Sequence, residues 1–365
     1  MSKWDVFPFS DLIRDETRYA KKIKQEDYLS EGKYQIIDQG QAQVAGYADD
    51  EEGLYKDVPA IIFGDHTRIL KYVDSPFFLG ADGVKLLKVE NDRLDYKFLF
   101  YFLLNSNIPD TGYNRHFKWL KSLLISVPPI KTQKHISKVL DKTQEIIGGH
   151  KKQYEELDNL IKATFYDMFG DPVANEREWK IGSLATLACI MSGGTPSRAI
   201  PGYFEGSIPW ITSVALNKLF VGDEDAVEHI TEDAIRNSST KIVKSSSVLF
   251  GIRVGVGKVS INSVAMCTSQ DIVSITNFDL TFNKIFLAEM LKKFSSHFES
   301  LQRGATIKGI TTEVLRTTRL IIPPIGLQNR FSEIVTNIET QKSLVKQSLT
   351  ESQNLFNSLM SRYFD

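Results

Sequence analysis

The chain has 365 residues, of which 42% are hydrophobic and 24% charged, and its formal net charge is -1. This balance is typical of a globular protein with enough apolar side chains for more than one core. No run of about 18 apolar residues occurs, which excludes a transmembrane helix, and the first residues lack the apolar stretch of a signal peptide. The only cysteines are Cys189 and Cys267, so we expect reduced thiols and a cytoplasmic protein.

The near-neutral total charge argues against a strongly basic nucleic-acid binder, but the charges are unevenly distributed. Residues 97–124 contain four bases and one acid, and residues 284–319 contain seven bases and three acids. Acidic residues gather elsewhere, at 49–52 and at 223–225. The protein can therefore carry a basic face in spite of its total charge, although ordinary solvated surface charge explains the same counts equally well.

The first part of the chain, residues 1–130, is predicted to form a mixed α and β domain in which strands dominate. Short runs rich in β-branched and aromatic residues predict strands, and a longer apolar run predicts a helix. The expected strands lie at 34–37, 60–63 and 84–89, and the expected helix lies at 96–104. After Phe63-Gly64 comes a loop that carries three bases, His66, Arg68 and Lys71.

Residues 131–170 are predicted to form a long helix that follows Pro128-Pro129. Proline suits the first turn of a helix and blocks its extension upstream. Apolar residues then recur in alternating steps of three and four, which places them on one stripe. The stripe consists of Ile136, Leu140, Ile147, Tyr154, Leu157 and Ile161. Because each glycine costs about 1 kcal/mol relative to alanine, we expect a local break or bend at Gly148-Gly149.

Residues 171–324 are predicted to form a second domain of the same kind. Its expected strands lie at 247–250, 258–261 and 271–275, and its expected helix lies at 283–294. A second Phe-Gly step, Phe250-Gly251, leads into a loop with Arg253 and Lys258. This loop occupies the same place in the order of elements as the basic loop of the first domain. We expect Trp210 to be a core residue.

The last helix, expected at 325–365, repeats the first at a constant shift of 195 residues, since Pro128-Pro129 returns as Pro323-Pro324. Its apolar stripe consists of Phe331, Val335, Ile338, Val345, Leu349 and Phe356. Two helices of equal length and phase favour antiparallel pairing in a coiled-coil-like spacer between the domains, with pseudo-two-fold symmetry. The alternative is that each helix packs only on its own domain.

The ordered motifs resemble those of type I restriction-modification specificity subunits. In the second domain they are Ser192-Gly-Gly-Thr-Pro-Ser-Arg198, Ser207-Ile-Pro-Trp-Ile-Thr-Ser213, Val248-Leu-Phe-Gly251 and Gly257-Lys-Val259. In the first domain they are Gly32-Lys-Tyr34, Ile61-Ile-Phe-Gly-Asp-His-Thr-Arg68 and Gly80-Ala-Asp-Gly83. The Pro-Pro-x-x-x-Gln junction before each helix is also similar, and the resemblance covers nearly the whole chain. The first domain lacks the Gly-Gly-Thr-Pro and Ile-Pro-Trp motifs, so its DNA contacts cannot be transferred from the second.

The resemblance implies a non-catalytic subunit that recognises DNA sequence. Two target-recognition domains would read the two halves of a bipartite site on double-stranded DNA. Two methyltransferase subunits, using S-adenosylmethionine, and restriction subunits, using ATP and Mg, would be its partners. This chain itself would hold no cofactor and no metal, and would not bind a membrane.

Candidate DNA contacts are loop bases and hydroxyls, which can bind phosphates or base edges. They are His66, Arg68, Lys71, Arg115, His116 and Lys118 in the first domain, and Thr195, Ser197, Arg198, Arg253, Lys258, Arg303 and Lys308 in the second. Gly193, Gly194 and Pro196 are expected to shape their loop.

Two other classes of function explain parts of the sequence. A coiled-coil scaffold that binds only proteins explains the helices but not the two motif-bearing domains. A stand-alone DNA methyltransferase needs a polar residue before its catalytic Pro-Pro and an aromatic residue after it, and neither Pro-Pro step here has them. The glycines at 251, 255 and 257 lack dinucleotide-binding spacing, no Walker A sequence occurs, and no nuclease cluster is evident.

Overall fold

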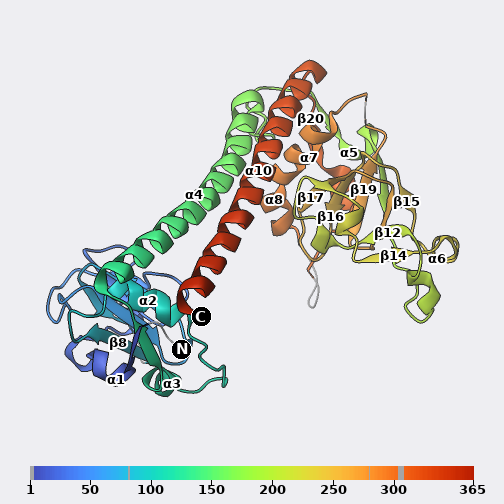
Figure 1. Cartoon of the computed structure of the whole chain (residues 1–365). Coiled ribbons are helices and arrows are strands. Elements are labelled where there is room, and N and C mark those ends of the chain that lie inside the picture. Colours follow the sequence, from blue (N-terminus) through green and yellow to red (C-terminus); the bar gives the residue numbers. More distant parts are fainter. Residues whose placement is uncertain (1–3, 81–82, 279, 303–307) are drawn as a thin grey trace. The chain divides into compact units, whose positions relative to one another are not determined.

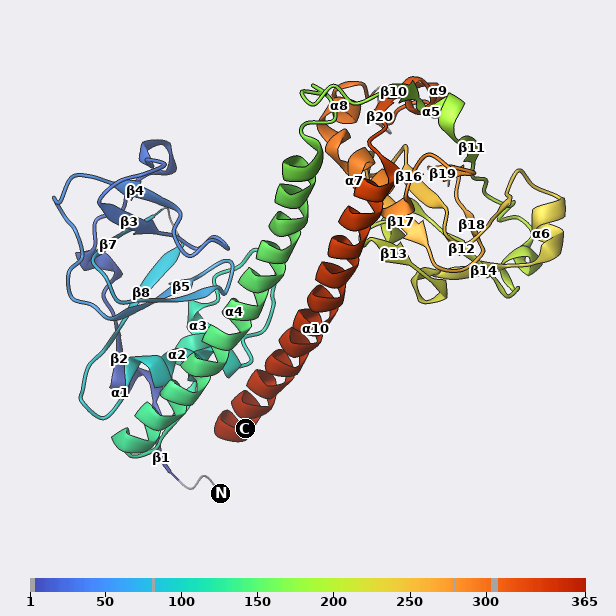
Figure 2. The same ribbon diagram turned by 90° about the horizontal axis from the view of Figure 1, so that it is seen from above.

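The computed structural model describes residues 4–80, 83–278, 280–302 and 308–365. The chain divides into two compact units: unit 1 comprises residues 1–152 and 346–365, and unit 2 comprises residues 153–345. Each unit contains one globular domain and part of each long helix, α4 (Ile130–Phe169) and α10 (Ile325–Phe364) (Figure 1 and Figure 2). Both helices begin and end within one residue of the predicted bounds. Among the described residues, no helix combines the length and apolar character needed to cross a membrane.

The domain of unit 1 contains two small sheets and, in addition, a two-stranded antiparallel sheet of β1 and β9. The first has the antiparallel order β2-β8-β5-β6, and the second has the order β4-β3-β7, in which β3 runs parallel to β7. The strands are β1 (Asp5–Pro8), β2 (Ile13–Asp15), β3 (Tyr34–Ile37), β4 (Gly46–Ala48), β5 (Ala60–Gly64), β6 (Leu70–Val73), β7 (Phe77–Leu79), β8 (Val84–Val89) and β9 (Leu124–Val127). The helices are α1 (Phe9–Leu12), α2 (Tyr96–Asn105) and α3 (Phe117–Lys121).

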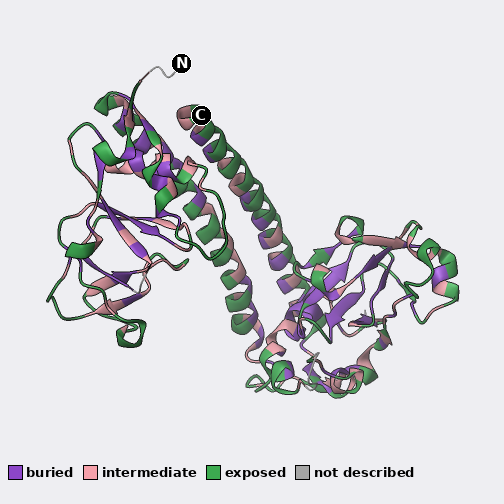
Figure 3. Ribbon diagram, turned by 90° about the horizontal axis from the view of Figure 1, so that it is seen from below, coloured by how far each residue is buried: buried purple, intermediate pink, exposed green. Residues whose placement is uncertain are grey.

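Unit 2 repeats this plan with two sheets ordered β11-β19-β16-β17-β13 and β14-β12-β18-β15, and with a two-stranded antiparallel sheet of β10 and β20. The strands are β10 (Ile181–Ser183), β11 (Cys189–Ser192), β12 (Ile208–Ile211), β13 (Phe220–Val221), β14 (Glu228–Ile230), β15 (Ile242–Val243), β16 (Val248–Gly251), β17 (Val259–Asn262), β18 (Met266–Thr268), β19 (Ile272–Thr276) and β20 (Arg319–Ile321). The helices are α5 (Leu184–Leu187), α6 (Glu232–Arg236), α7 (Lys284–Lys293), α8 (Ser295–Ser300) and α9 (Thr312–Thr317). Figure 3 shows that the sheet strands are mostly buried and the connecting loops mostly exposed.

The sheet orders confirm the internal repeat and show which strands of the two units correspond. The order β2-β8-β5-β6 corresponds element by element to β11-β19-β16-β17. Strand β3 corresponds to β12, because β3 and β12 each pair in parallel with one neighbour and antiparallel with another. The counterpart of β17 is β6, a strand that the sequence analysis did not predict.

The two long helices pair antiparallel within each unit. In unit 1, Ile136 and Leu140 from the first half of α4 share a core with Phe356 and Met360 from the end of α10. In unit 2, the opposite halves of the helices meet in the same way. All the predicted stripe residues are buried or half-buried. Each core also includes sheet residues, so the helices pack both on each other and on the domains.

The glutamine of each Pro-Pro-x-x-x-Gln junction connects a long helix to its domain. Gln133 is fully buried, and its Oε1 accepts a hydrogen bond from the backbone N–H of Asp95 at 2.8 Å. Its Nε2 donates to the carbonyl oxygens of Arg93 at 2.6 Å and Pro128 at 2.7 Å. Gln328 makes the three equivalent hydrogen bonds in unit 2. The shared motif therefore has a structural explanation that does not depend on a ligand.

Replacing Gln133 with alanine should lower the free energy of unfolding of unit 1 by about 2–3 kcal/mol, because buried polar backbone groups lose their partners. Urea denaturation of the variant and the unchanged chain measures the difference. Gln144→Ala is the matched control, since Gln144 is exposed on the same helix and should change stability by less than about 0.5 kcal/mol. Equal stability of the two variants would refute this role for Gln133.

Helix α4 is unbroken through Gly148 and Gly149, so the expected break is absent. Both glycines are exposed, and apart from the adjoining backbone of the helix no atom lies within 4 Å of the position that a Cβ would take. The neighbouring Ile147 is 3% exposed and packs in the core of unit 1. Packing of the apolar stripe therefore outweighs the low helix propensity of two glycines.

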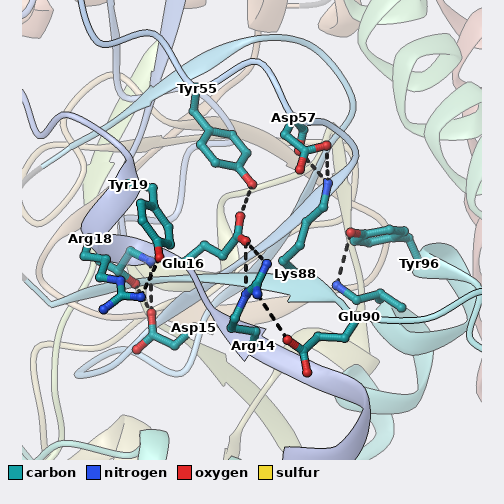
Figure 4. Close-up of polar contacts among 12 residues, drawn as sticks. Arg14, Asp15, Glu16, Arg18, Tyr19, Tyr55, Asp57, Lys88, Glu90 and Tyr96 are labelled. Atoms are coloured by element: carbon teal, nitrogen blue, oxygen red, sulfur yellow. Dashed lines mark hydrogen bonds and ion pairs between the residues drawn. The ribbon is translucent and has the colours of Figure 1, made fainter.

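A polar network joins the edge of the first sheet of unit 1 to its interior (Figure 4). The Glu16 carboxylate is 6% exposed and accepts hydrogen bonds from the Tyr55 hydroxyl and from Arg14 Nη2, both at 2.6 Å. Burial and the Glu16 carboxylate raise the pKa of Tyr55. Because its polar groups have partners within the domain, this network is a structural element rather than a candidate binding site.

Candidate functional site

In both units, a hairpin loop of the first sheet lies beside the segment that precedes a short helix. In unit 1, hairpin loop 1 (residues 65–69) joins β5 to β6, and its neighbouring segment (residues 106–116) joins α2 to α3. The Asp65 carboxylate accepts a hydrogen bond from the backbone N–H of Phe117 at 2.7 Å. The Asp65 carbonyl oxygen accepts another from the backbone N–H of His116 at 2.8 Å. The loop is thereby fixed to the start of α3.

Arg68 connects hairpin loop 1 to the middle of the neighbouring segment. Its guanidinium donates to Oδ2 of Asp110 at 2.6 Å and to the carbonyl oxygen of Ile108 at 3.2 Å. A hydrogen bond from the Gly112 backbone and the charge of Arg68 lower the pKa of Asp110. Since a carboxylate already balances its charge, Arg68 is a weaker candidate for a phosphate contact than an unpaired arginine.

An aromatic pair also joins hairpin loop 1 to its neighbouring segment. The His66 imidazole stacks on the Tyr113 ring with the centroids 4.6 Å apart, and its Nδ1 lies 3.2 Å from the carbonyl oxygen of Asn114. Tyr113 is 88% exposed. His66 was predicted from the sequence and Tyr113 was not, although an aromatic residue in a basic segment was the available signal. Together the rings form a flat surface with polar edges.

Two of the predicted contacts lie in the interior of unit 1 instead. Lys71 is 2% exposed, and its Nζ donates to the Asp38 carboxylate at 3.3 Å and to the Ala42 carbonyl oxygen at 2.5 Å. Burial lowers the pKa of Lys71. His116 is fully buried, and its Nδ1 donates to the Asp65 carbonyl oxygen at 2.9 Å. The prediction that Lys71 and His116 contact DNA is therefore wrong, because neither side chain reaches the surface.

Arg115 and Lys118 flank the buried His116 and are both exposed. The Lys118 ammonium lies 5.3 Å from the centroid of the Trp119 ring. Both side chains therefore remain candidates for contacts with an anionic partner. Arg115 lies on the neighbouring segment itself, and Lys118 lies on α3, which follows it.

In unit 2, hairpin loop 2 (residues 252–258) joins β16 to β17 and pairs with the segment between α8 and α9. Arg253 forms a β-bridge with Gly309, and the backbone N–H of Ile310 donates to the Ile252 carbonyl oxygen at 2.9 Å. A Cβ on Gly309 would lie 2.7 Å from Cγ of Arg253, so glycine permits this close approach. The bridge therefore places the backbone of Arg253 near that of Lys308, the residue before Gly309.

The loop bases of unit 2 are more accessible than those of unit 1. Arg253, Lys258 and Lys308 are exposed, and their side chains make no ion pair or hydrogen bond with any residue that the structure describes. Arg303, another predicted contact, lies outside the described residues. Three exposed cations without a described partner therefore lie on hairpin loop 2 or beside it.

The Gly-Gly-Thr-Pro loop of unit 2 lies against the second sheet. A Cβ on Gly194 would overlap backbone atoms of Ser239 and Thr240, and a Cβ on Gly193 would overlap Thr268. The Gly194 carbonyl oxygen accepts a hydrogen bond from Nε1 of Trp210 at 3.0 Å. Trp210 is 3% exposed, as expected for a core residue. These contacts, together with the burial of Pro196, hold the loop in one conformation.

The residues that follow in this loop are more exposed. Thr195 is half-buried, whereas Ser197 and Arg198 are exposed. The guanidinium of Arg198 binds both carboxylate oxygens of Glu228 at 2.8 Å and lies 4.8 Å from the centroid of the Phe204 ring. This ion pair lowers the pKa of Glu228. Arg198 would therefore have to give up a bidentate partner before it could bind a phosphate.

The chain belongs to the family described as the type I restriction modification DNA specificity domain, whose sequence model matches residues 1–159 and again residues 176–352. The two matches correspond to the two halves of the internal repeat. The family therefore agrees with the resemblance of the sequence motifs.

Two relatives agree with this assignment, and a solved structure has a similar fold. The chain is 25% identical to the specificity subunit of the type I restriction enzyme EcoR124I/EcoR124II of Escherichia coli, over 94% of this chain and 88% of that protein. It is 22% identical to the putative MjaX specificity subunit of Methanocaldococcus jannaschii, over 78% of this chain and 72% of that protein. A similar fold occurs in the type I restriction-modification S subunit of M. genitalium, with a TM-score of 0.65, 14% identity and coverage of 100% and 96% of the two chains.

Proposed function

We propose that this protein is the DNA-recognition subunit of a type I restriction-modification complex, and that each unit reads one half of a bipartite site on double-stranded DNA. The observation that carries the proposal is the repeated arrangement of a hairpin loop beside its neighbouring segment, with accessible bases in each. Repetition of one module within a chain suits a target with two separate parts. Membership of the specificity-domain family supports the same function.

The side chains of the hairpin loops would divide into two roles. Lysine and arginine on phosphates position a domain, whereas a few side chains that reach base edges in the major groove determine the sequence. In unit 2, Arg253 and Lys308 are the foremost candidates because both are exposed and unpaired with described residues. In unit 1, His66 and Tyr113 supply polar ring edges, and Arg115 supplies an exposed charge.

Chemistry would belong to partner subunits. Two methyltransferase subunits would bind this chain and use S-adenosylmethionine, and restriction subunits would use ATP and Mg for translocation and cleavage. Because the net charge of this chain is only -1, the partner subunits would supply much of the positive charge that lines the DNA channel. A scaffold that binds only proteins is not supported, because the family match covers both globular domains as well as much of the helices.

A reconstituted complex of this chain with its methyltransferase partner tests the proposal directly. Binding to duplex DNA should weaken steeply with salt, because lysine and arginine contacts release counterions from the phosphates. Binding should also prefer duplexes that contain the bipartite site over unrelated duplexes of equal length. A folded complex that shows neither the salt dependence nor the sequence preference would reject this function.

Arg253→Ala and Lys308→Ala should each weaken DNA binding by about 1–3 kcal/mol without lowering the melting temperature. Both side chains are exposed and make no polar contact with described residues, so the fold does not depend on them. Fluorescence anisotropy with a labelled duplex and a thermal melt measure the two quantities. Lys180→Ala is the control, because Lys180 is also exposed in unit 2. Reduced stability with unchanged affinity would remove that residue from the interface.

A further inference from the structure

A lysine-rich cavity lies within unit 2, next to the end of hairpin loop 2. Its volume is about 710 Å³, and its walls come from α4, α10, the end of α7, the start of α8, residues 216–219 and the junction of hairpin loop 2 with β17. All of the lining residues belong to unit 2. The lysines among them are Lys162, Lys218, Lys258, Lys292, Lys293 and Lys342.

Three of these lysines already have acidic partners. The Lys342 ammonium lies 2.7 Å from the Asp158 carboxylate and 2.8 Å from that of Glu339. The Lys292 ammonium lies 2.5 Å from the Glu289 carboxylate, and the Lys218 ammonium lies 2.9 Å from the Asp225 carboxylate. Each acidic group that lines the cavity, Asp158, Glu289 and Glu339, is therefore already paired with a lysine.

The other three lysines, Lys162, Lys258 and Lys293, make no ion pair with any described residue. The Lys293 ammonium lies 5.4 Å from the centroid of the Phe165 ring and 5.6 Å from that of Tyr166. These rings hold the ammonium at the cavity wall through cation–π contacts. The six lysines that line the cavity therefore outnumber by one the carboxylates paired with them, which are Asp158, Glu224, Asp225, Glu289 and Glu339.

The lysines of this cavity also repel one another. Burial lowers the pKa of Lys293, the charges of Lys292 and Lys162 lower it further, and the Glu289 carboxylate opposes them. An anion placed among these groups would remove the repulsion and gain several charge-assisted hydrogen bonds. The hydroxyl-bearing side chains of Ser295 and Ser296 line the same space and add neutral donors.

The position of the cavity connects it with hairpin loop 2. Gly257, at the end of that loop, has a φ of +84°, and a Cβ there would lie 3.0 Å from Cβ of Ser295. Glycine therefore allows the loop to pack on the start of α8. As a result Lys258, the next residue, lines the cavity, while Arg253 occupies the other end of the same loop.

The cation cluster is not part of the internal repeat. At the shift of 195 residues, Lys162 corresponds to Asn357. Lys293 ends α7, and the residue that ends α2 in unit 1 is Asn105, whose amide donates to Asp365 at 2.9 Å. Since unit 1 folds on the same plan without these lysines, the fold does not require them. Their gathering in unit 2 points to a ligand.

We propose that this cavity binds a phosphate group of the DNA backbone beside the bases that hairpin loop 2 reads. The inference rests on the proposed DNA-recognition function and adds a second contact region to unit 2. Unpaired ammonium groups and hydroxyls are suitable donors for a phosphodiester, whose charge is spread over oxygens that carry no sequence information. The cavity would therefore increase affinity for all duplexes without changing the sequence that is recognised.

The test uses the full chain in its complex with the methyltransferase partner, and compares Lys162→Gln and the double variant Lys162→Gln/Lys293→Gln with the unchanged complex. Affinity for a duplex with the bipartite site is measured from about 50 to about 200 mM salt. The slope of log affinity against log salt should fall by about one for the single variant and about two for the double variant. Preference among sequences should not change, and Lys180→Gln should leave the slope unaltered.

A slope that stays at the unchanged value in both variants would overturn the inference. The single variant guards against misfolding, because Lys162 is exposed and has no described partner. Melting curves in inorganic phosphate, against chloride at equal ionic strength, identify the source of the phosphate. Stabilisation of the unchanged complex that the double variant loses, with an unaltered DNA slope, would assign the cavity to a free phosphate compound and reject the DNA contact. If the unchanged complex shows no sequence preference, the proposed function fails instead.

Discussion

Replacing Phe331 with alanine should lower the free energy of unfolding of unit 2 by about 3–5 kcal/mol. Phe331 is fully buried on α10, and its ring centroid lies 5.5 Å from that of Phe165 and 5.4 Å from that of Phe169, both on α4. It also faces Phe286 on α7 at 6.4 Å. The substitution therefore leaves a cavity where both long helices meet the domain of unit 2.

Hydrogen exchange, followed by mass spectrometry of peptides, measures this loss separately for the two units. Peptides from the core of unit 2 should exchange faster in Phe331→Ala, whereas peptides from the sheets of unit 1 should change much less. Leu344→Ala on the same helix is the control, because Leu344 is 61% exposed and should cost less than about 0.5 kcal/mol. Similar exchange in both variants would contradict the central position of Phe331.

Gly194→Ala should destabilise unit 2 by about 1–3 kcal/mol and should alter recognition of only one half of the DNA site. The new Cβ would overlap backbone atoms of Ser239 and Thr240, which cannot move aside as a flexible side chain would. The loop that carries Thr195 and Ser197 must then shift. Hairpin loop 1 belongs to the other unit and should keep its conformation.

Thermal melts and a binding competition between duplexes mutated in one half-site or the other measure the two effects of Gly194→Ala. Gly202→Ala is the matched control, since nothing lies within 4 Å of the Cβ position of Gly202. A Gly194→Ala complex with normal stability and normal preference at both half-sites would show that the loop tolerates the extra methyl group.

The long helices and the repeat could be predicted from the sequence because both depend on local periodicity. The stripe from Ile136 to Ile161 and the 195-residue shift of the Pro-Pro step fix helix bounds to within one residue. The low helix propensity of glycine predicted a break that is absent, because tertiary packing around Ile147 keeps α4 helical through Gly148 and Gly149.

The candidate site was less predictable, because the exposure of a loop base depends on contacts distant in sequence. Lys71 follows Arg68 by three residues, yet Asp38 and the Ala42 carbonyl oxygen hold its ammonium in the interior. His116 is buried because the backbone of Asp65 binds it across 51 residues. Nothing in the local sequence distinguishes these bases from the exposed Arg115.

The lysine cavity of unit 2 could not be found from the sequence for the same reason. Lys162, Lys258 and Lys293 come from α4, hairpin loop 2 and α7, and each looks alone like an ordinary surface charge. Only the fold brings them together. Periodicity therefore predicts elements well, whereas the selection of binding residues needs the tertiary structure.

The most direct test of the central claim is genome-wide DNA methylation in cells that carry this protein with its methyltransferase partner, against cells with the partner alone. We expect a new bipartite methylated motif. Exchanging residues 171–324 for the corresponding domain of a relative should change one half of that motif and preserve the other. A motif that changes in both halves, or no new motif in spite of an assembled complex, would contradict the account of two independent recognition domains.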